Sequence, residues 1–483
     1  MSRRIVGPFN RVEGDLEVRL EVEAGRVREA WVTSPLYRGF EQILHGKDPR
    51  DALVYTPRIC GICSVAQSVA TATALADCQG VTMPANGELA VNLILAAENV
   101  ADHLSHFYLF FMPDFAREAY AGEAWHAEIE ARFKALSGSA ARQVLPARAQ
   151  FLHLMGLLAG KWPHSLAIQP GGTTRAIKAQ EQARIEAILF AFRRFLESEL
   201  FGDGLENIVA LDSLPALREW AEKGPWQRCD LSRFLHLADR LGLERLGRGS
   251  DVFMSFGVYG RAGERLFPRG LWRDGSPSAL DPTLIREDLS HAWLAHRESP
   301  RHPFEGVTAV DAGAADGYSW CKAPRLAGQV VEVGALARQV VDGHPLVRDL
   351  VRRSGGNVRN RVIARLLEIA RVVMAMEGWA RELTAGEPFC HHAPMPDEAE
   401  GCGMMEAARG SLGHWLRVRN GRILNYQIIA PTTWNFSPRD RHGEPGALER
   451  ALVGAPVRDG ETEPLAVQHI VRSFDPCMVC TVH

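Results

Sequence analysis

Two C-x-x-C pairs near opposite ends of the sequence place the strongest constraint on how this chain can fold. Cys60 and Cys63 form the first pair and Cys477 and Cys480 the second, so the inner cysteines are 477 − 63 = 414 positions apart. In a reducing compartment, thiols at this spacing more often bind metals or carry redox chemistry than form structural bridges. If both pairs share one site, the ends of the chain must meet, which predicts a single interwoven unit over residues 1–483.

The cysteine content leaves several kinds of site open. Nine cysteines in 483 residues are too few for a disulfide-rich scaffold. Four soft sulfur ligands suit zinc, iron-sulfur, copper(I) or nickel-iron chemistry. Structural zinc is the usual explanation for two such pairs, but zinc ribbons and fingers bring their pairs together within a few tens of residues. Two independent redox or structural pairs are a further alternative. The remaining cysteines are expected to bind no metal: Cys78, Cys229, Cys321, Cys390 and Cys402.

The composition is that of a soluble globular protein, with 46% hydrophobic residues, 23% charged residues and a net charge of −3. No long run of Lys or Arg indicates a nucleic-acid or membrane-surface patch. The most apolar run, Leu104–Phe111, is short and contains Ser105 and His106, so no membrane span is expected. Near the N-terminus, Arg11 and Glu13 interrupt any apolar export segment, and we therefore expect a cytoplasmic location.

Residue periodicity predicts a mainly helical α+β chain, with a core of long helices and small peripheral antiparallel hairpins. Apolar residues recur at helical spacing, without internal proline, over 88–111, 175–200 and 357–383. An Ala-rich helix is predicted over 64–77, directly after the first cysteine pair. Free backbone N–H groups and the helix dipole are expected to stabilise thiolates there.

Two hairpins and one irregular segment complete the predicted organisation. Apolar and charged residues alternate over 16–32, and an Asn-Gly turn within 418–423 is typical of a tight hairpin. Residues 223–317 are richer in Gly, Pro, Arg and Asp and weaker in periodicity. We expect this segment to be a loop-rich elaboration rather than a separate domain.

The residues around both cysteine pairs resemble the signatures of nickel-iron hydrogenase large subunits. The matching patterns are R-x-C-G-x-C over 58–63 and D-P-C-x-x-C-x-x-H over 475–483. Similar blocks occur in order along nearly the whole chain: Arg11–Gly14, Tyr37–Glu41, Ala101–His103, His106–Tyr108, Pro170–Gly172, Ser319–Arg325, Glu406–Gly410, Gly413–Trp415 and Ala430–Asn435. The resemblance implies the fold of that subunit and the reversible cleavage of dihydrogen to protons and electrons.

The resemblance also implies a ligand set. Cys60 and Cys477 would be terminal ligands of nickel, whereas Cys63 and Cys480 would bridge it to an iron that carries one carbon monoxide and two cyanides. Thiolates supply the donor strength that an electron-rich metal needs, and they can themselves be protonated. By the same resemblance, Cys477 would receive the proton of dihydrogen and pass it to Glu13.

Further matches would surround the iron. Arg409 corresponds to an arginine whose cationic fork could hydrogen-bond a cyanide or hold the substrate over the metals. Asp102 and Asp475 would orient this arginine. Thr432, which follows Pro431, would donate to the other cyanide.

Two more residues match ligands of a magnesium-like divalent ion that ties down the end of the chain in this family. They are Glu41 and His483. His103, His106 and His414 also fall within family-like blocks, but we expect them to be packed or supporting residues rather than metal ligands.

Several departures from the usual pattern resemble the regulatory, hydrogen-sensing subgroup. Gln67 stands where catalytic members have histidine. Ile62 and Phe110 are bulkier than the common valine and leucine, and larger apolar side chains would narrow a gas route to the centre. With the short length and an end at His483, these features predict a low-turnover hydrogen sensor. An energy-conserving uptake hydrogenase is the alternative.

The ligand set also predicts a partner. Nine cysteines leave too few for an iron-sulfur relay, so electrons must leave through an iron-sulfur small subunit. For a sensor, dihydrogen is the signal, and the small subunit would connect the chain to a sensor histidine kinase. No nucleic-acid partner is expected. A structural zinc protein is the remote alternative.

Overall fold

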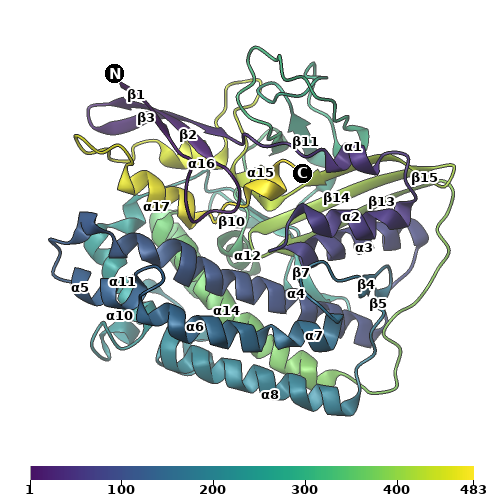
Figure 1. The fold of residues 1–483 in the computed structure, drawn as a ribbon, viewed down its shortest axis with the longest axis horizontal. Coiled ribbons are helices and arrows are strands. Elements are labelled where there is room, and N and C mark those ends of the chain that lie inside the picture. Colours follow the sequence, from purple (N-terminus) through teal and green to yellow (C-terminus); the bar gives the residue numbers. More distant parts are fainter. Residues whose placement is uncertain (1) are drawn as a thin grey trace.

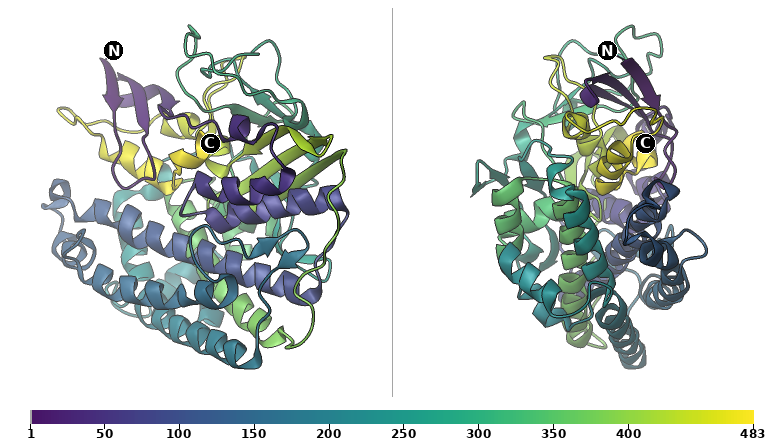
Figure 2. Two further views of the ribbon diagram at one scale, coloured as in Figure 1. Left: turned by 45° about the vertical axis from the view of Figure 1, so that its right-hand side comes forward. Right: turned by 90° about the vertical axis from the view of Figure 1, so that its left-hand side faces the viewer.

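The computed structural model describes residues 2–483 and confirms the predicted mainly helical α+β architecture (Figure 1). Long helices lie side by side below two small antiparallel sheets, and Figure 2 shows the same arrangement from two further sides. The long helices are α4 (Ala85–Ser105), α6 (Ser139–Phe151), α8 (Ala179–Phe195) and α14 (Val358–Glu382). No helix in the described part of the chain is long and apolar enough to cross a membrane.

The three predicted long helices are confirmed as α4, α8 and α14. In α4 and α8 the last predicted turn is a π-helix, over His106–Phe111 and Leu196–Phe201. Helix α14 begins after Asn357, whose side chain accepts a hydrogen bond from the backbone N–H of Asn360 at 3.0 Å. Such a cap satisfies one of the N–H groups that the first turn of a helix leaves unpaired.

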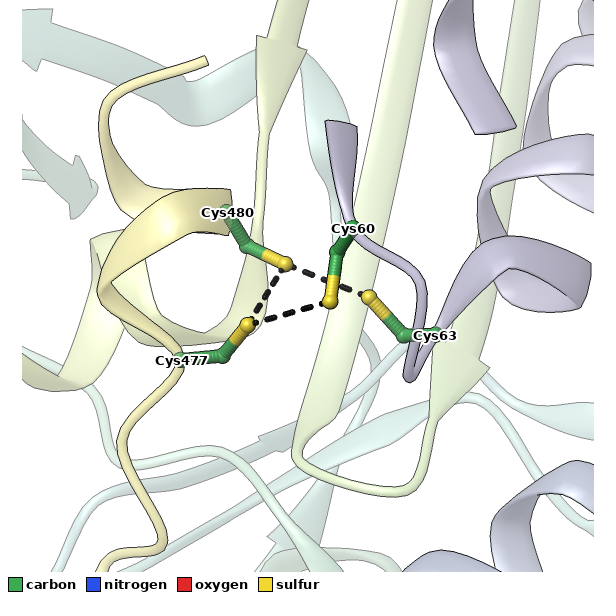
Figure 3. Close-up of side chains that lie close together, drawn as sticks. All are labelled: Cys60, Cys63, Cys477 and Cys480. Carbon is green, nitrogen blue, oxygen red and sulfur yellow. Dashed lines mark hydrogen bonds between the residues drawn. The ribbon is translucent and has the colours of Figure 1, made fainter. Parts of the chain in front are cut away.

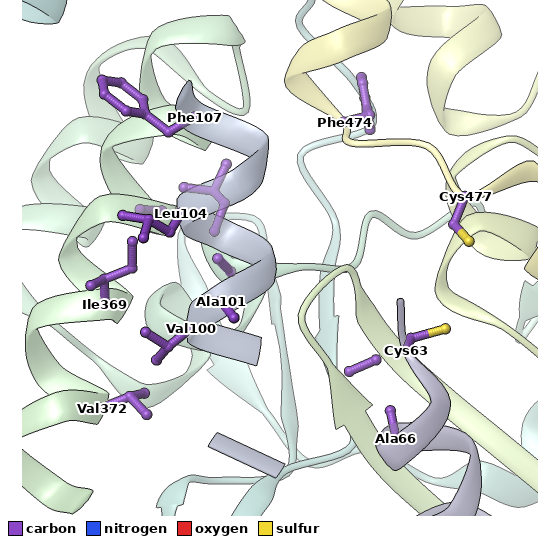
Figure 4. Packing of buried hydrophobic residues seen from close by; sticks show 14 of the residues in the cluster. Cys63, Ala66, Val100, Ala101, Leu104, Phe107, Ile369, Val372, Phe474 and Cys477 are labelled. Carbon is purple, nitrogen blue, oxygen red and sulfur yellow. The ribbon is translucent and has the colours of Figure 1, made fainter. Parts of the chain in front are cut away.

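Helix α4 lies between the helical core and the cysteine pairs. Its Val100 and Leu104 are buried and face Ile369 of α14 (Figure 4). Cys63 and Cys477 lie beyond the opposite side of α4. One helix therefore contacts both the apolar core and the surroundings of the cysteines.

Each predicted hairpin belongs to a three-stranded antiparallel sheet. The strand orders are β1-β2-β3 and β13-β14-β15. The strands are β1 (Ser2–Val6), β2 (Glu17–Glu23), β3 (Arg26–Thr33), β13 (Ala399–Ala407), β14 (Gly410–Arg419) and β15 (Arg422–Ile429). In the turn before β15, φ is 51° at Asn420 and 67° at Gly421, as a primed hairpin turn requires.

Helix α3 (Ser64–Gln79) packs directly against strand β13. A Cβ atom at Gly403 would lie 1.9 Å from the carbonyl oxygen of Ala70, and one at Gly401 would lie 2.3 Å from that of Ala74. Only glycine allows the two backbones to approach so closely. Since β13 runs antiparallel to α3, the turn that follows β13 lies beside the start of the helix.

The segment 223–317 contains one regular helix and a series of short strands joined by irregular stretches. The helix is α11 (Asp230–Leu241), whose Phe234 and Leu237 are buried. The strands are β6 (Phe253–Ser255), β7 (Val258–Arg261), β8 (Glu264–Phe267), β9 (Gly270–Arg273), β10 (Ser276–Ser278) and β11 (Ile285–Asp288).

Shorter elements connect these parts. They are α1 (Phe40–Leu44), α2 (Ala52–Tyr55), α5 (His126–Phe133), α7 (His153–Ala159), β4 (Ile168–Gln169), β5 (Gly172–Thr173), α9 (Leu205–Val209), α10 (Leu214–Glu222), β12 (Ala323–Leu326), α12 (Ala335–Asp342), α13 (Pro345–Ser354), α15 (Pro431–Asn435), α16 (Ala447–Leu452), α17 (Leu465–Ser473) and α18 (Met478–Thr481).

The two ends of the described chain meet, as a shared site requires. Glu13 and Cys477 form a parallel β-bridge, and the backbone N–H of Met478 donates to the carbonyl oxygen of Glu13 at 2.7 Å. One hydrophobic cluster contains buried residues from Val6 to Cys480. The N-terminal and C-terminal segments are therefore built into the same core.

Candidate metal centre

Four cysteine side chains from the two ends of the chain converge in one buried cluster (Figure 3). The Sγ atoms of Cys60, Cys63, Cys477 and Cys480 all lie within 4.8 Å of one another. The Cys477–Cys480, Cys63–Cys480 and Cys60–Cys477 distances are 2.9, 3.2 and 3.5 Å. One ion with metal–sulfur bonds of about 2.3 Å would hold tetrahedral sulfurs about 3.8 Å apart. The donor set thus fits a shared thiolate centre rather than two independent pairs.

The cluster stands alone among the residues that the structure describes. Within 2–483, no other group of three or more His, Cys, Asp or Glu side chains lies close enough to hold an ion. His103 and His106 instead hydrogen-bond Glu368 and the carbonyl oxygen of Arg472, at 3.1 and 2.6 Å. Both are buried supporting residues, as the sequence suggested.

Crowding and burial change the acidity of the four thiols unequally. Contacts with the other thiols, chiefly that of Cys477, hold the pKa of Cys60 well below its usual range. Contact with Cys477 and burial raise the pKa of Cys63, and burial raises the pKa of Cys480. A bound metal ion would favour the thiolate form of every ligand.

The first cysteine pair directly precedes helix α3, as predicted, but the expected role of its free N–H groups is wrong. The backbone N–H groups of Val65 and Ala66 donate to the carboxylate of Glu98, each at 2.9 Å, so they are not free to stabilise a thiolate. The backbone N–H of Ile62 instead lies 3.3 Å from the sulfur of Cys60.

Glu98 is a site residue that the sequence analysis missed. It lies on α4, four positions before Asp102, and is buried. Four positions span about one helical turn, so both carboxylates face the same side. A second acidic residue at this spacing in a buried helix was the signal that could have identified it.

Arg409 is held beside the cysteine cluster by two buried carboxylates. Its two terminal nitrogens donate to both carboxylate oxygens of Asp102, at 2.7 and 3.1 Å. It also donates to the carboxylate and the backbone carbonyl of Asp475, at 3.1 and 3.0 Å. The structure therefore brings together the three residues that the sequence predicted. A guanidinium has five N–H donors, so one remains for a ligand of the centre.

The charges around Arg409 keep it ionised. Burial alone would lower the pKa of Arg409. The pKa is nevertheless raised, because the carboxylates of Asp102 and Asp475 and the nearby thiols favour the charged guanidinium. Burial raises the pKa of Asp102 to about 7, with Arg409 opposing that rise. A fixed cation therefore faces the sulfur cluster.

A second buried arginine holds the backbone that precedes Arg409. Arg338 of α12 donates at 2.8 Å to each carbonyl oxygen of the two residues before Arg409. Its remaining N–H groups donate to the carboxylates of Glu368 and Glu406 at 2.7 to 3.1 Å. All five donors of Arg338 are thus satisfied, which fixes the turn between β13 and β14.

Two further predicted residues lie against the C-terminal cysteines. Glu13 is half-buried, and burial followed by the charge of Cys60 raises its pKa. Thr432 lies next to Pro431 at the start of α15, and its hydroxyl oxygen accepts the backbone N–H of Cys477 at 3.1 Å. The hydroxyl hydrogen of Thr432 remains able to donate.

The predicted divalent-ion ligands also come together. Glu41 Oε1 and His483 Nε2 are 3.1 Å apart, and the ammonium of Lys322 lies 2.9 and 3.0 Å from the two Glu41 oxygens. Burial alone would raise the pKa of Glu41, but Lys322 and His483 lower it below its usual value. Glu287 lies 3.5 Å from Lys322, and its Oε1 has no hydrogen-bond partner in the described part of the chain. The structure thus brings Glu41 and His483 together, and the divalent ion beside them stays a prediction.

The positions that indicated a sensor lie around the first cysteine pair and α4. The Gln67 side-chain oxygen is 2.8 Å from His414 Nε2, and His414 Nδ1 is 2.8 Å from the hydroxyl of Tyr426. Ile62 is partly buried against the main core, and Phe110 is partly exposed in the π-helical turn after α4. The gas route through these two residues stays a prediction.

Comparison with known families decides what the chain is related to. A family model described as nickel-dependent hydrogenase matches residues 38–141 and 118–483. The chain belongs to the nickel-dependent hydrogenase family. It is therefore related to enzymes, as predicted, and this membership replaces the structural zinc interpretation.

Individual relatives cover nearly the entire chain. It is 30% identical to the periplasmic NiFeSe hydrogenase large subunit of Desulfomicrobium baculatum, over 99% of this chain and 94% of that protein. It is 29% identical to the hydrogenase-2 large chain of Escherichia coli K12, over 100% and 97% of the two chains. It is 28% identical to the uptake hydrogenase large subunit of Rhizobium leguminosarum bv. viciae, over 100% and 95%.

A solved structure has the same fold. The reduced Ni-Fe-Se hydrogenase from D. vulgaris Hildenborough matches with a TM-score of 0.85 and 29% identity, and the match covers 100% of both chains. The predicted hydrogenase large-subunit fold is thereby confirmed.

Proposed function

We propose that this chain is the active-site subunit of a nickel-iron hydrogenase that senses dihydrogen by cleaving it reversibly to protons and electrons. The observation that carries the proposal is the convergence of four thiols within 4.8 Å beside a buried arginine. Family membership supports nickel as the metal. An iron-sulfur small subunit would take the electrons, because the five cysteines outside the cluster are too few for an iron-sulfur relay in this chain.

The cysteines would divide between two metals. Cys60 and Cys477 would be terminal on nickel, and Cys63 and Cys480, whose sulfurs are 3.2 Å apart, would be shared with an iron that carries one carbon monoxide and two cyanides. When bound, this centre supplies the electron-rich site at which dihydrogen is split. A magnesium-like ion would bind separately beside Glu41.

Residues of this chain would position the reactants and move the proton. The sulfur of Cys477 would hold the proton, and the carboxylate of Glu13 would accept it, since a raised carboxyl pKa favours proton transfer near neutral pH. Arg409 would offer its remaining N–H to one cyanide or to the substrate. The Thr432 hydroxyl would donate to the other cyanide.

Infrared spectroscopy and metal analysis of the purified two-subunit complex test the proposal. We expect carbonyl and cyanide stretching bands together with one nickel and one iron per large chain. Zinc without nickel, or a nickel-loaded complex without these bands, would contradict it.

The proton route is tested by Glu13→Gln, with the exposed Asp15→Asn as the matched control. An amide keeps the shape of the carboxylate but does not accept the proton. We expect Glu13→Gln to abolish hydrogen–deuterium exchange while nickel and iron remain bound, and Asp15→Asn to leave exchange unchanged. Normal exchange in Glu13→Gln would remove this residue from the route.

The sensing role is the finer part of the proposal, and an energy-conserving uptake enzyme is the alternative to it. Gln67, Ile62 and Phe110 support a sensor, which would signal through the small subunit to a histidine kinase. Replacing Ile62 by Val and Phe110 by Leu should increase inactivation by oxygen. Unchanged oxygen tolerance would refute the gas route.

A further inference from the structure

Helix α4 and the residue that directly follows it carry three buried polar residues spaced four apart, and each contacts a different segment near the metal centre. Glu98 accepts hydrogen bonds from the start of α3, and Asp102 binds Arg409. The Nε2 atom of His106 lies 2.6 Å from the carbonyl oxygen of Arg472, in the helix that leads to the second cysteine pair. Residues four apart share a helix face. This face therefore organises three converging segments.

Glu98 is the member of this set that no predicted role explains. Its carboxylate accepts the backbone N–H groups of Val65 and Ala66, each at 2.9 Å, and the indole N–H of Trp162 at 2.8 Å. The hydroxyl of Ser64 is a fourth donor at 3.3 Å. All four partners are donors, and Glu98 itself is 2% exposed.

These contacts replace a missing helix cap. Cys63 occupies the N-cap position of α3, where a polar side chain usually accepts the N–H of the second or third helical residue. The sulfur of Cys63 instead lies 3.2 Å from that of Cys480, and its side chain makes no cap hydrogen bond. Those same N–H groups, of Val65 and Ala66, are taken by Glu98. The cap for α3 thus comes from α4.

We propose that Glu98 is a positioning residue for the first cysteine pair. By binding the first turn of α3, it keeps the sulfur of Cys63 directed toward Cys480. The inference deepens the proposed function and rests on it for the identity of the metals.

The chain offers a closely matched control. Glu449 of α16 is also buried and accepts two backbone N–H groups, from Val32 at 2.9 Å and Gly446 at 3.2 Å. Its third donor is an aromatic residue, the hydroxyl of Tyr318 at 2.8 Å. Burial raises the pKa of both carboxyls, to about 8 for Glu98 and about 7 for Glu449. The two differ in that Glu449 caps a helix that carries no metal ligand.

The test compares Glu98→Gln with Glu449→Gln in the complete two-subunit complex. Both variants lose a buried carboxylate, so we expect similar decreases in melting temperature. Only Glu98→Gln should shift the infrared carbonyl band and lower the nickel content per chain, because an amide has one acceptor oxygen for the two backbone N–H groups and the sulfur of Cys63 loses its placement. A carbonyl band and nickel content equal to those of Glu449→Gln would overturn the proposal.

A milder pair of variants covers the case in which Glu98→Gln does not fold. Trp162→Phe and Tyr318→Phe each remove one donor and leave the carboxylate in place. We expect a smaller carbonyl shift in Trp162→Phe alone, and the same band in both would refute the role of Glu98. If the unaltered complex shows no carbonyl band, the proposed function fails, and the metal retained per chain by the variants still decides the role of Glu98.

Discussion

Arg409 shows how strongly one residue of the site depends on the geometry of its partners. Its planar fork binds both oxygens of Asp102 and still reaches Asp475 through two further hydrogen bonds. A lysine carries the same charge but has three donors around one nitrogen, so it cannot reproduce this arrangement. Charge alone is therefore not sufficient at this position.

We predict that Arg409→Lys lowers the rate of dihydrogen oxidation by about 10²-fold or more, the cost of misplacing a group at a reaction centre by about 1 Å. Nickel and iron should remain bound, because Arg409 is not a ligand. Hydrogen-dependent dye reduction and metal analysis measure the two outcomes.

Arg417→Lys provides the control for Arg409→Lys. Arg417 pairs with Glu400 at 2.8 Å, and the two side chains are 40% and 56% exposed. The same substitution there should leave the rate unchanged. A fully active Arg409→Lys enzyme would show that the fork geometry is unimportant.

At the scale of elements, the turn over Met112–Ala116 connects the N-terminal segment to α17. Its Asp114 binds Arg472 of α17 at 2.7 and 2.9 Å and also pairs with Arg11, two positions before Glu13. The carboxylate is fully buried. It therefore fixes both segments that lead into the metal centre.

The charge of Asp114 should make stability depend on pH. Burial alone would raise the pKa of Asp114, but His469 and Arg472 lower it below its usual value of 3.8. Because the folded-state pKa lies below the unfolded one, the contribution is complete above about pH 4 and is lost as the pH falls toward the folded-state pKa.

We predict that Asp114→Asn decreases the free energy of unfolding by about 3–5 kcal/mol at pH 7, because Arg472 loses its buried partner. The difference in free energy of unfolding between the variant and the unaltered protein should become smaller at acidic pH. Denaturant unfolding over a pH series measures it. Asp48→Asn, which removes a more exposed partner of Arg50, should cost about 1 kcal/mol or less. Equal losses in both variants would contradict the prediction.

At the scale of the whole molecule, the metal centre joins segments that are 414 positions apart in sequence. The β-bridge between Glu13 and Cys477 is a second link between the N-terminal and C-terminal parts of the chain. A metal that binds the folded chain and not the unfolded one adds stability through mass action. The centre should therefore act as a structural tie as well as a reaction site.

We predict that protein made without nickel and iron has a lower melting temperature and faster hydrogen exchange over 475–483 than the loaded protein. The stabilisation would be about 4 kcal/mol when free metal exceeds its dissociation constant 1,000-fold. Exchange in α14, which contains no ligand, should change much less. Identical exchange over 475–483 in both preparations would show that the bridge alone holds the chain ends.

Local patterns in the sequence were sufficient for most of the architecture. The helix α14 and the hairpin at Asn420 and Gly421 were predicted because apolar spacing and turn chemistry act over a few neighbouring residues. The two cysteines of each C-x-x-C pair are likewise only three positions apart, so their closeness can be read from the sequence alone. The resemblance of the flanking residues then predicted which side chains would gather around the cysteines.

The tertiary structure alone decided how buried polar groups are paired. That Glu98 caps α3, that Arg338 holds the turn before Arg409, and that Lys322 lies against Glu41 all depend on residues distant in sequence. A buried donor or acceptor must find a partner, but sequence spacing does not say which segment supplies it. The two C-x-x-C pairs determined that a soft metal could bind. Their convergence, and the carboxylates and arginines that surround them, follow from how α4 and the chain ends pack together.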